Sequence, residues 1–177
     1  MRKGKKTTGT LRSMLCAALC AVVLAASTLL SGCAQAPMSA AHLKRDPWSL
    51  EEPRSLVTKF MRFDYQVMPV GDVAGIKGWA YLDTAKLPEG VKWVESLTFT
   101  AYLCDPDGRV MAQDTRTFLP REARADDGIG FEFTLQPEAW GQRPLFIAFG
   151  YRLVLTEGRG VQGAKGPFFA SEDAATR

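Results

Sequence analysis

The sequence predicts an all-β fold, an antiparallel β-sandwich that spans residues 56–170. No stretch after Leu56 keeps a helical periodicity for three turns. Several short segments instead alternate apolar and polar residues and are rich in β-branched and aromatic side chains, which is typical of half-buried strands. Segments rich in Gly, Pro and Asp separate them and predict turns. About seven short strands in one domain are typical of an immunoglobulin-like sandwich.

We expect six strands at Lys59–Val70, Val73–Leu82, Val91–Cys104, Arg109–Leu119, Gly130–Leu135 and Leu145–Thr156. Gly158–Gly166 is expected to form a final loop and Pro167–Phe169 an edge strand, the seventh. The apolar faces of these strands predict the core, to which we assign Phe99, Leu103, Phe133 and Phe149. Asp105-Pro106-Asp107-Gly108 predicts a tight turn, since Pro presets the backbone angle and Gly accepts a positive φ. We therefore expect a hairpin between the third and fourth strands.

The start of the chain has a basic segment, residues 1–6, and then an apolar run from Met14 to Leu30. Small residues and a cysteine follow, which gives Leu30-Ser31-Gly32-Cys33. This arrangement resembles the lipobox of bacterial lipoproteins. The resemblance implies cleavage before Cys33, a diacylglyceryl group on its thiol and a further fatty acyl chain such as palmitate on its amine. An uncleaved membrane span, for which the run is barely long enough, and plain secretion are the alternatives.

These features divide the chain into four parts: a signal peptide over residues 1–32, the lipidated Cys33 with a flexible tether over 33–55, the sandwich over 56–170 and a loose tail over 171–177. Prolines along the tether disfavour helices and sheet ladders there. Ala34, and not the Asp that retains such lipoproteins at the inner membrane, follows the lipidated residue. We therefore expect the protein at the outer membrane of the cell envelope, facing the periplasm.

Composition narrows the possible functions. Cleavage of the signal peptide removes five of the 22 basic residues, which leaves 17 basic and 19 acidic residues and a net charge of −2. A chain with this charge has no basic surface of the kind that binds nucleic acid. Of four cysteines, two lie in the signal and Cys33 is lipidated, so Cys104 is left as a free, half-buried strand residue. The single histidine, His42, lies in the tether. We therefore expect no catalytic site, no metal site and no cofactor.

Parts of the predicted sandwich resemble the FxLYD domains of bacterial envelopes. The matching stretches are Gly75–Tyr81, Val94–Asp105 and Gly108–Val110, with Leu103-Cys104-Asp105 in place of Leu-Tyr-Asp. The resemblance implies an immunoglobulin-like sandwich without assigned chemistry. The anchor, size and fold class also resemble the sandwich lipoprotein of type VI secretion systems.

Other polar groups favour ordinary structural roles. The pairs Asp105/Asp107 and Asp126/Asp127 lack the remaining ligands of a calcium loop and are typical of turns. The glycines between Gly158 and Gly166 do not join a strand to a helix as a phosphate loop does. Three loop arginines could clamp an anion: Arg121, Arg124 and Arg159.

The aromatic residues of the polar faces are the best candidates for a contact site. They are Trp79, Tyr81, Trp93 and Tyr102, of which we expect Trp79 and Tyr81 to bind a partner. The sequence thus predicts a non-catalytic envelope lipoprotein, attached to the membrane by lipid on Cys33, whose sandwich binds a protein or cell-wall partner. A carrier of a small ligand between the sheets, or a secretion-system lipoprotein, is the alternative. The oligomeric state is left open.

Overall fold

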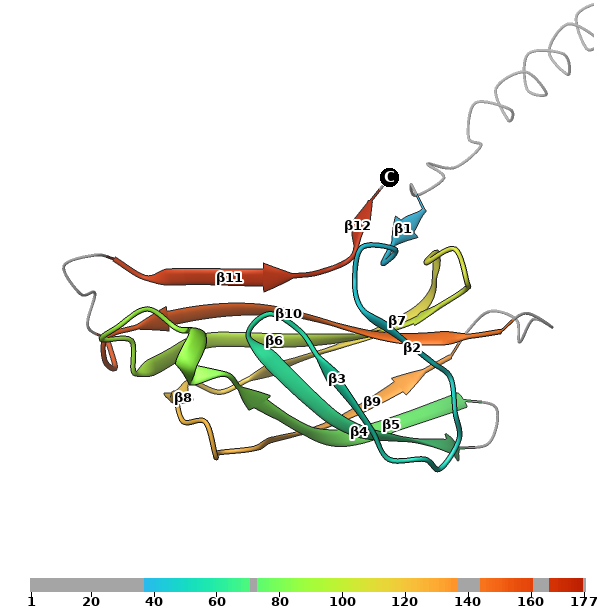
Figure 1. Ribbon diagram of the computed structural model, residues 1–177, viewed down its shortest axis with the longest axis horizontal. Coiled ribbons are helices and arrows are strands. Elements are labelled where there is room, and N and C mark those ends of the chain that lie inside the picture. The colour runs from blue at the N-terminus through green and yellow to red at the C-terminus, as the bar shows by residue number, and fades with distance from the viewer. Residues whose placement is uncertain (1–36, 71–72, 137–143, 161–165, 177) are drawn as a thin grey trace, which may run out of the picture. The chain divides into compact units, whose positions relative to one another are not determined.

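The computed structural model describes residues 37–70, 73–136, 144–160 and 166–176. Two antiparallel sheets pack face to face in this part of the chain (Figure 1). What we term the first sheet has the order β3-β4-β5-β9, and the second has the order β11-β10-β6-β7. The prediction of an antiparallel, all-β sandwich is confirmed.

The first sheet consists of β3 (Arg54–Val57), β4 (Met61–Val70), β5 (Val73–Leu82) and β9 (Ile129–Leu135). The second consists of β6 (Trp93–Cys104), β7 (Val110–Phe118), β10 (Phe146–Thr156) and β11 (Phe168–Glu172), with the short β2 (Arg45–Pro47) on β10 and β8 (Arg121–Glu122) on β6. A two-stranded pair joins β1 (Met38–Ser39) to β12 (Ala175–Thr176), and one 3₁₀ turn spans Thr84–Lys86.

The seven predicted strands are β4, β5, β6, β7, β9, β10 and β11. If these strands are numbered in chain order, the first, second and fifth lie side by side in one sheet and the other four lie in the second sheet. This arrangement is the A-B-E and G-F-C-C′ pattern of an immunoglobulin-like sandwich. The crossings between the sheets bring residues distant in the sequence together in one core.

Aromatic rings fill the space between the sheets. Phe63 of β4 stacks on Phe149 of β10 with ring centroids 4.6 Å apart, and Phe99 of β6 meets Phe63 edge-on at 5.2 Å. Burial follows the predicted alternation, most clearly along β9, where every second residue is buried. The four residues that the sequence assigns to the core are all buried: Phe99, Leu103, Phe133 and Phe149.

The hairpin between β6 and β7 also forms as predicted. Gly108 has a φ of +80° and its amide donates to the carbonyl of Asp105 at 3.0 Å, while the Asp105 carboxylate accepts from the amide of Arg109 at 2.9 Å. A Cβ atom at Gly108 would lie 2.5 Å from the Cα atom of Ala41. Glycine is therefore required both by the turn and by the chain that crosses it.

The prediction of a flexible tether over 33–55 is wrong for the residues that the structure describes there. Residues 37–57 contain three strands, and Ala40 and Leu43 are buried against Tyr102 and Ala148 on the outer face of the second sheet. The expected loose tail over 171–177 likewise contains the end of β11 and β12, the partner of β1. The prolines did not prevent this, because edge strands two or three residues long tolerate proline.

Candidate functional site

The outer face of the first sheet carries the two predicted contact residues. Trp79 and Tyr81 both point outward from β5, since their neighbours Ala80 and Leu82 are buried in the core. Trp79 is 56% exposed, which makes it one of the most exposed large apolar side chains among the described residues. Tyr81 is half-buried.

Two glycines of the neighbouring segment allow the Trp79 ring to lie close to the sheet. Gly130 is paired with Trp79 across β5 and β9, and a Cβ atom at Gly130 would lie 3.3 Å from the ring carbon Cζ3 of Trp79. At Gly128 a Cβ atom would lie 3.1 Å from Cε3 of Trp79 and 3.0 Å from Cε1 of Tyr81. The two rings thus occupy space that side chains at 128 and 130 would otherwise fill, and they present one continuous aromatic surface.

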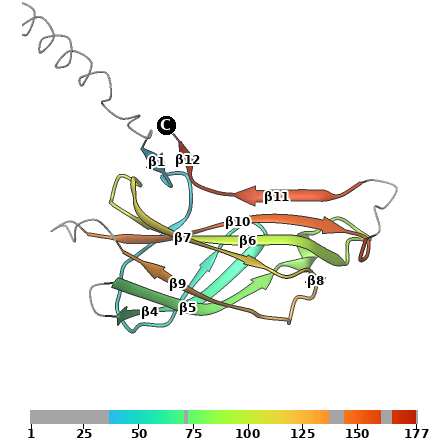
Figure 2. The same cartoon turned by 180° about the vertical axis from the view of Figure 1, so that it is seen from behind.

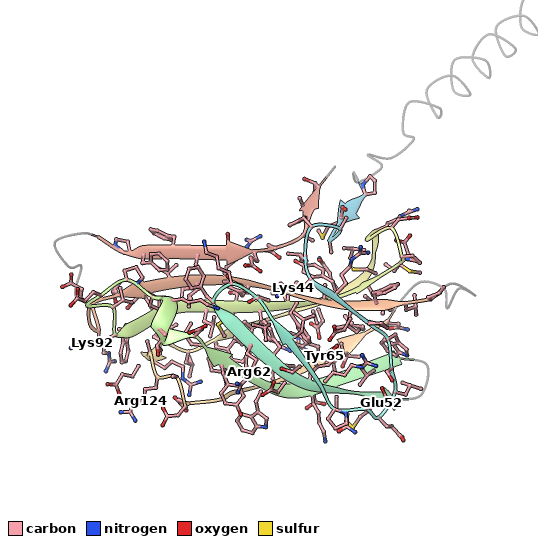
Figure 3. The ribbon with its side chains drawn as sticks, viewed as in Figure 1. Lys44, Glu52, Arg62, Tyr65, Lys92 and Arg124 are labelled. Carbon is pink, nitrogen blue, oxygen red and sulfur yellow. The ribbon has the colours of Figure 1, made fainter. Side chains whose placement is uncertain are left out.

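Charged groups of β4 border this aromatic surface. Arg62, labelled in Figure 3, places its guanidinium carbon 4.6 Å from the centre of the Tyr81 ring and its Nε 3.2 Å from a carboxylate oxygen of Asp64. The Asp64 carboxylate also accepts a hydrogen bond of 2.6 Å from the hydroxyl of Ser55. These contacts hold Asp64 beside Trp79, its partner in the ladder between β4 and β5.

An open groove of about 670 Å³ crosses the sheet beside Trp79. Its polar side chains belong to four strands: Arg54, Asp64, Gln66, Lys77 and Glu132. Gln66, Lys77 and Glu132 form a row across β4, β5 and β9, because each is the ladder partner of the next. Within the described part of the chain, neither Lys77 nor Glu132 makes an ion pair, so both remain available to a ligand.

One end of the groove is held by a small polar network. Glu52 accepts hydrogen bonds from Ser49 at 2.6 Å and from Arg54 at 2.9 Å, and these bonds lower the pKa of the Glu52 carboxyl. Gln66 donates from its amide nitrogen to the carbonyl of Glu51 at 2.9 Å. The N-terminal segment therefore forms part of the groove wall, although the sequence predicted it to be a free tether.

The other two predicted aromatic residues, Trp93 and Tyr102, do not join this surface. Both belong to β6 of the second sheet, and Tyr102 is only 2% exposed because the N-terminal segment covers it. Its phenol donates to the carboxylate of Asp173, and burial, with this hydrogen bond, raises the pKa of Tyr102 to about 12. The predicted aromatic face is therefore split between opposite sides of the sandwich.

Cys104, Arg121 and Arg124 make contacts typical of structural roles. Cys104 is buried and free, and burial raises the pKa of its thiol to about 12, far from that of a nucleophile. Arg121 pairs with Asp127 at 3.2 Å, and Arg124 pairs with Glu122 at 2.6 Å, so neither is free to clamp an anion. No cluster of three metal-ligating side chains occurs among the residues that the structure describes.

Cys33 and the rest of the predicted lipobox lie outside the described residues. Within the described ranges, no helix is long and apolar enough to cross a membrane. No protein family matches the sequence, and a search of curated proteins returns no significant match.

Sequence reasoning placed Trp79 and Tyr81 on an outward face but missed the groove beside them. The alternation along β4, β5 and β9 marks Asp64, Gln66, Lys77 and Glu132 as outward-facing. These four residues line one groove only because of the strand order and register. Between β5 and β9 the chain crosses to the second sheet and back, so the pairing of these two strands cannot be read from local sequence. The glycine pair 128 and 130 was the one local signal, since glycine on an outward strand position leaves room for a neighbouring ring.

Proposed function

We propose that the protein is a lipid-anchored, non-catalytic binding protein of the bacterial cell envelope. Its anchor is the lipid on Cys33, and its contact surface is the outer face of the first sheet around Trp79 and Tyr81. The resemblance of Leu30–Cys33 to a lipobox supports the anchor. The absence of Asp at position 34 supports the outer membrane, facing the periplasm, as the location.

The observation that carries the contact surface is the exposed indole of Trp79 beside an open groove. An exposed aromatic ring beside an open groove can bury apolar surface against a partner, which is favourable. Aromatic residues are also the side chains whose burial contributes most to binding. The interior between the sheets is filled with packed rings, so we do not propose a ligand carried there.

The anchor is tested by mass spectrometry of the mature amino terminus. We expect an acylated Cys33, and we expect Cys33→Ser to abolish acylation and to release the protein or stall its precursor. An unmodified and uncleaved amino terminus in the wild type would contradict the proposal. Fractionation of the wild type only with inner-membrane markers would contradict the location.

The contact surface is tested by crosslinking in intact envelopes. We expect a Trp79→Ser/Tyr81→Ser variant to lose its crosslinked partners while it melts close to the wild-type temperature. Phe169→Ser is the matched control, because Phe169 is 68% exposed but belongs to β11 of the second sheet. A double variant that folds and keeps every partner would place the contact surface elsewhere.

A further inference from the structure

The lining of the groove indicates the chemistry of its ligand. Trp79 contributes a flat apolar ring, and the groups around it are carboxylates, an amide and an ammonium: Asp64, Glu132, Gln66 and Lys77. Asp64 is paired with Arg62, whereas Lys77 and Glu132 have no ion-pair partner among the described residues; their charges are opposite, which favours a ligand without a strong net charge. An apolar platform with a few polar groups around it fixes a small ring by stacking and orients it by hydrogen bonds. A pyranose sugar has this combination of one apolar C–H face and a rim of hydroxyl groups.

The shape of the groove favours a chain of sugars. It is shallow and open, and it crosses β3, β4, β5 and β9, so a polymer can enter and leave at its ends. A protein strand would instead require a free sheet edge to pair with. The groove lies on a sheet face, where the backbone groups of β4 and β5 are already paired with neighbouring strands.

The start of the described chain leaves the groove uncovered, because the two lie on opposite outer faces of the sandwich. The chain enters the body on the outer face of the second sheet, where the amide of Ala40 donates to the carbonyl of Gly108 at 2.8 Å and Leu43 is buried. The groove lies on the opposite outer face, that of the first sheet, as the positions of β1 and β5 in Figure 2 show.

We propose that this groove binds a glycan strand of the bacterial cell wall. Trp79 stacks on the apolar face of one sugar ring, and Asp64, Gln66, Lys77 and Glu132 bond to hydroxyl and acetamido groups of that sugar and its neighbour. The inference rests on the proposed function, because the proposed envelope anchor places the protein beside the wall.

The test is co-sedimentation of the full-length protein, in detergent, with purified insoluble cell-wall sacculi. We expect the wild type to sediment with sacculi, Trp79→Ala to bind at least tenfold more weakly and Trp79→Phe to keep part of the affinity. Phe169→Ala, the exposed aromatic of the second sheet, should bind as the wild type does. Lys77→Ala and Glu132→Ala should each weaken binding several-fold, although both variants keep Trp79. These two variants test the proposal even if the Trp79 variants fail to fold.

Two treatments identify the recognised part of the wall. Glycan strands freed of their peptides by an amidase should still compete for the protein, as should soluble oligomers of β-1,4-linked N-acetylglucosamine. Competition by the released peptides alone would overturn the proposal, as would equal sedimentation of wild type and the Trp79, Lys77 and Glu132 variants. If crosslinking to a protein partner depends on Trp79 but sacculi do not bind, the proposed function stands and the glycan inference is wrong.

Discussion

The phenol of Tyr65 donates a hydrogen bond of 3.0 Å to the carboxylate of Asp46. Tyr65 lies on β4 of the first sheet and is 4% exposed, whereas Asp46 lies on β2, which pairs with β10 of the second sheet. The bond therefore joins the two sheets through the N-terminal segment. It also holds β2 beside the start of β3, where the segment forms one wall of the groove.

Tyr65→Phe tests how much this bond contributes to stability. We expect the free energy of unfolding to fall by about 1–3 kcal/mol, because the change removes a hydrogen bond to a charged group and leaves the Asp46 carboxylate without that partner. Chemical denaturation measures the difference. Tyr81→Phe is the control, since the ring that meets Arg62 is kept and only a half-exposed hydroxyl is lost. Equal effects of the two changes would mean that the Tyr65–Asp46 bond contributes nothing specific.

Stability should fall in alkaline solution because three tyrosines are buried. Burial raises the pKa of Tyr65, Tyr102 and Tyr151, in each case as the largest cause. The native state therefore favours the neutral phenol more than the unfolded state does. This contribution is complete below the ordinary tyrosine pKa of about 10 and is lost as pH rises above it, by up to about 1.4 kcal/mol per pH unit for each tyrosine.

Denaturant titrations between about pH 8 and pH 11 check this expectation against the ordinary tyrosine pKa. The midpoint should be nearly flat in the lower part of the range and fall above it. Tyrosinate absorbance should appear together with unfolding for the three buried phenols. Ionisation of all tyrosines near pH 10 in a still folded protein would contradict the raised pKa values.

Phe149→Ala should destabilise the sandwich by about 3–5 kcal/mol. Phe149 is 1% exposed and stacks on Phe63 at 4.6 Å, so its removal leaves a cavity between the two sheets. Phe169→Ala is the matched control, with an expected effect under about 0.5 kcal/mol because that ring is mostly exposed. Denaturant melts of similar midpoint for the two variants would mean that the interior collapses around the missing ring.

The sequence predicts the six long strands because their alternation extends over enough residues to identify a face, whereas for the edge strand β11 it finds only the start, at Phe168 and Phe169. β9 shows this most clearly, with Phe131, Phe133 and Leu135 inward and Glu132 and Thr134 outward. The short strands escape prediction because a strand of two or three residues has no period to detect. β1, β2 and β12 form because they cover exposed surface of the second sheet, which is a property of the assembled fold.

Tyr102 shows that alternation predicts the face of a strand but not the exposure of that face. It alternates with Leu103 and Ala101 and was therefore expected on the outside with Thr100. Thr100 and Tyr102 do point away from the main core, but both are buried, since Thr100 meets Thr115 at 3.1 Å and residues 40–43 cover Tyr102. Alternation thus identifies the face of a strand correctly, while the exposure of that face depends on which other segments pack on it.

Gly78→Ala should disrupt the pairing of β4 with β5. A Cβ atom at Gly78 would overlap the carbonyl oxygen of Asp64 and lie 2.8 Å from the Cα atom of Tyr65, both of which belong to the backbone of β4. Backbone atoms of a central strand cannot move aside as a flexible side chain can. We therefore expect a loss of about 2–4 kcal/mol in the free energy of unfolding.

Gly130→Ala provides the comparison on the same sheet. Its new methyl group would meet the Trp79 ring at 3.3 Å, and this ring is exposed and able to shift outward. The expected loss of stability is under about 1 kcal/mol. If thermal melts show a larger loss of stability for Gly130→Ala than for Gly78→Ala, the backbone of β4 at Asp64 can move aside.

Cys104 should report when the N-terminal segment leaves the sandwich. Its thiol is fully buried in a small cluster with Ala40, Leu43, Tyr102 and Ala148, on the face of the second sheet that this segment covers. Burial raises the pKa of this thiol to about 12, so the reactive thiolate is strongly disfavoured at neutral pH while the cluster is closed. Labelling by a thiol reagent therefore requires the cluster to open.

Leu43→Asp should accelerate this labelling far more than it lowers the global stability. The new carboxylate is unfavourable inside the cluster and favours the detached segment, while the core between the two sheets is untouched. The measurement is the labelling rate of Cys104 as a function of denaturant, followed by mass spectrometry on the peptide that contains Cys104. A detached segment gives a rate that depends weakly on denaturant, because little surface is exposed, whereas global unfolding gives a steep dependence. If the Leu43→Asp variant labels as slowly as the wild type, or only with the steep dependence of global unfolding, the segment does not open separately from the sandwich.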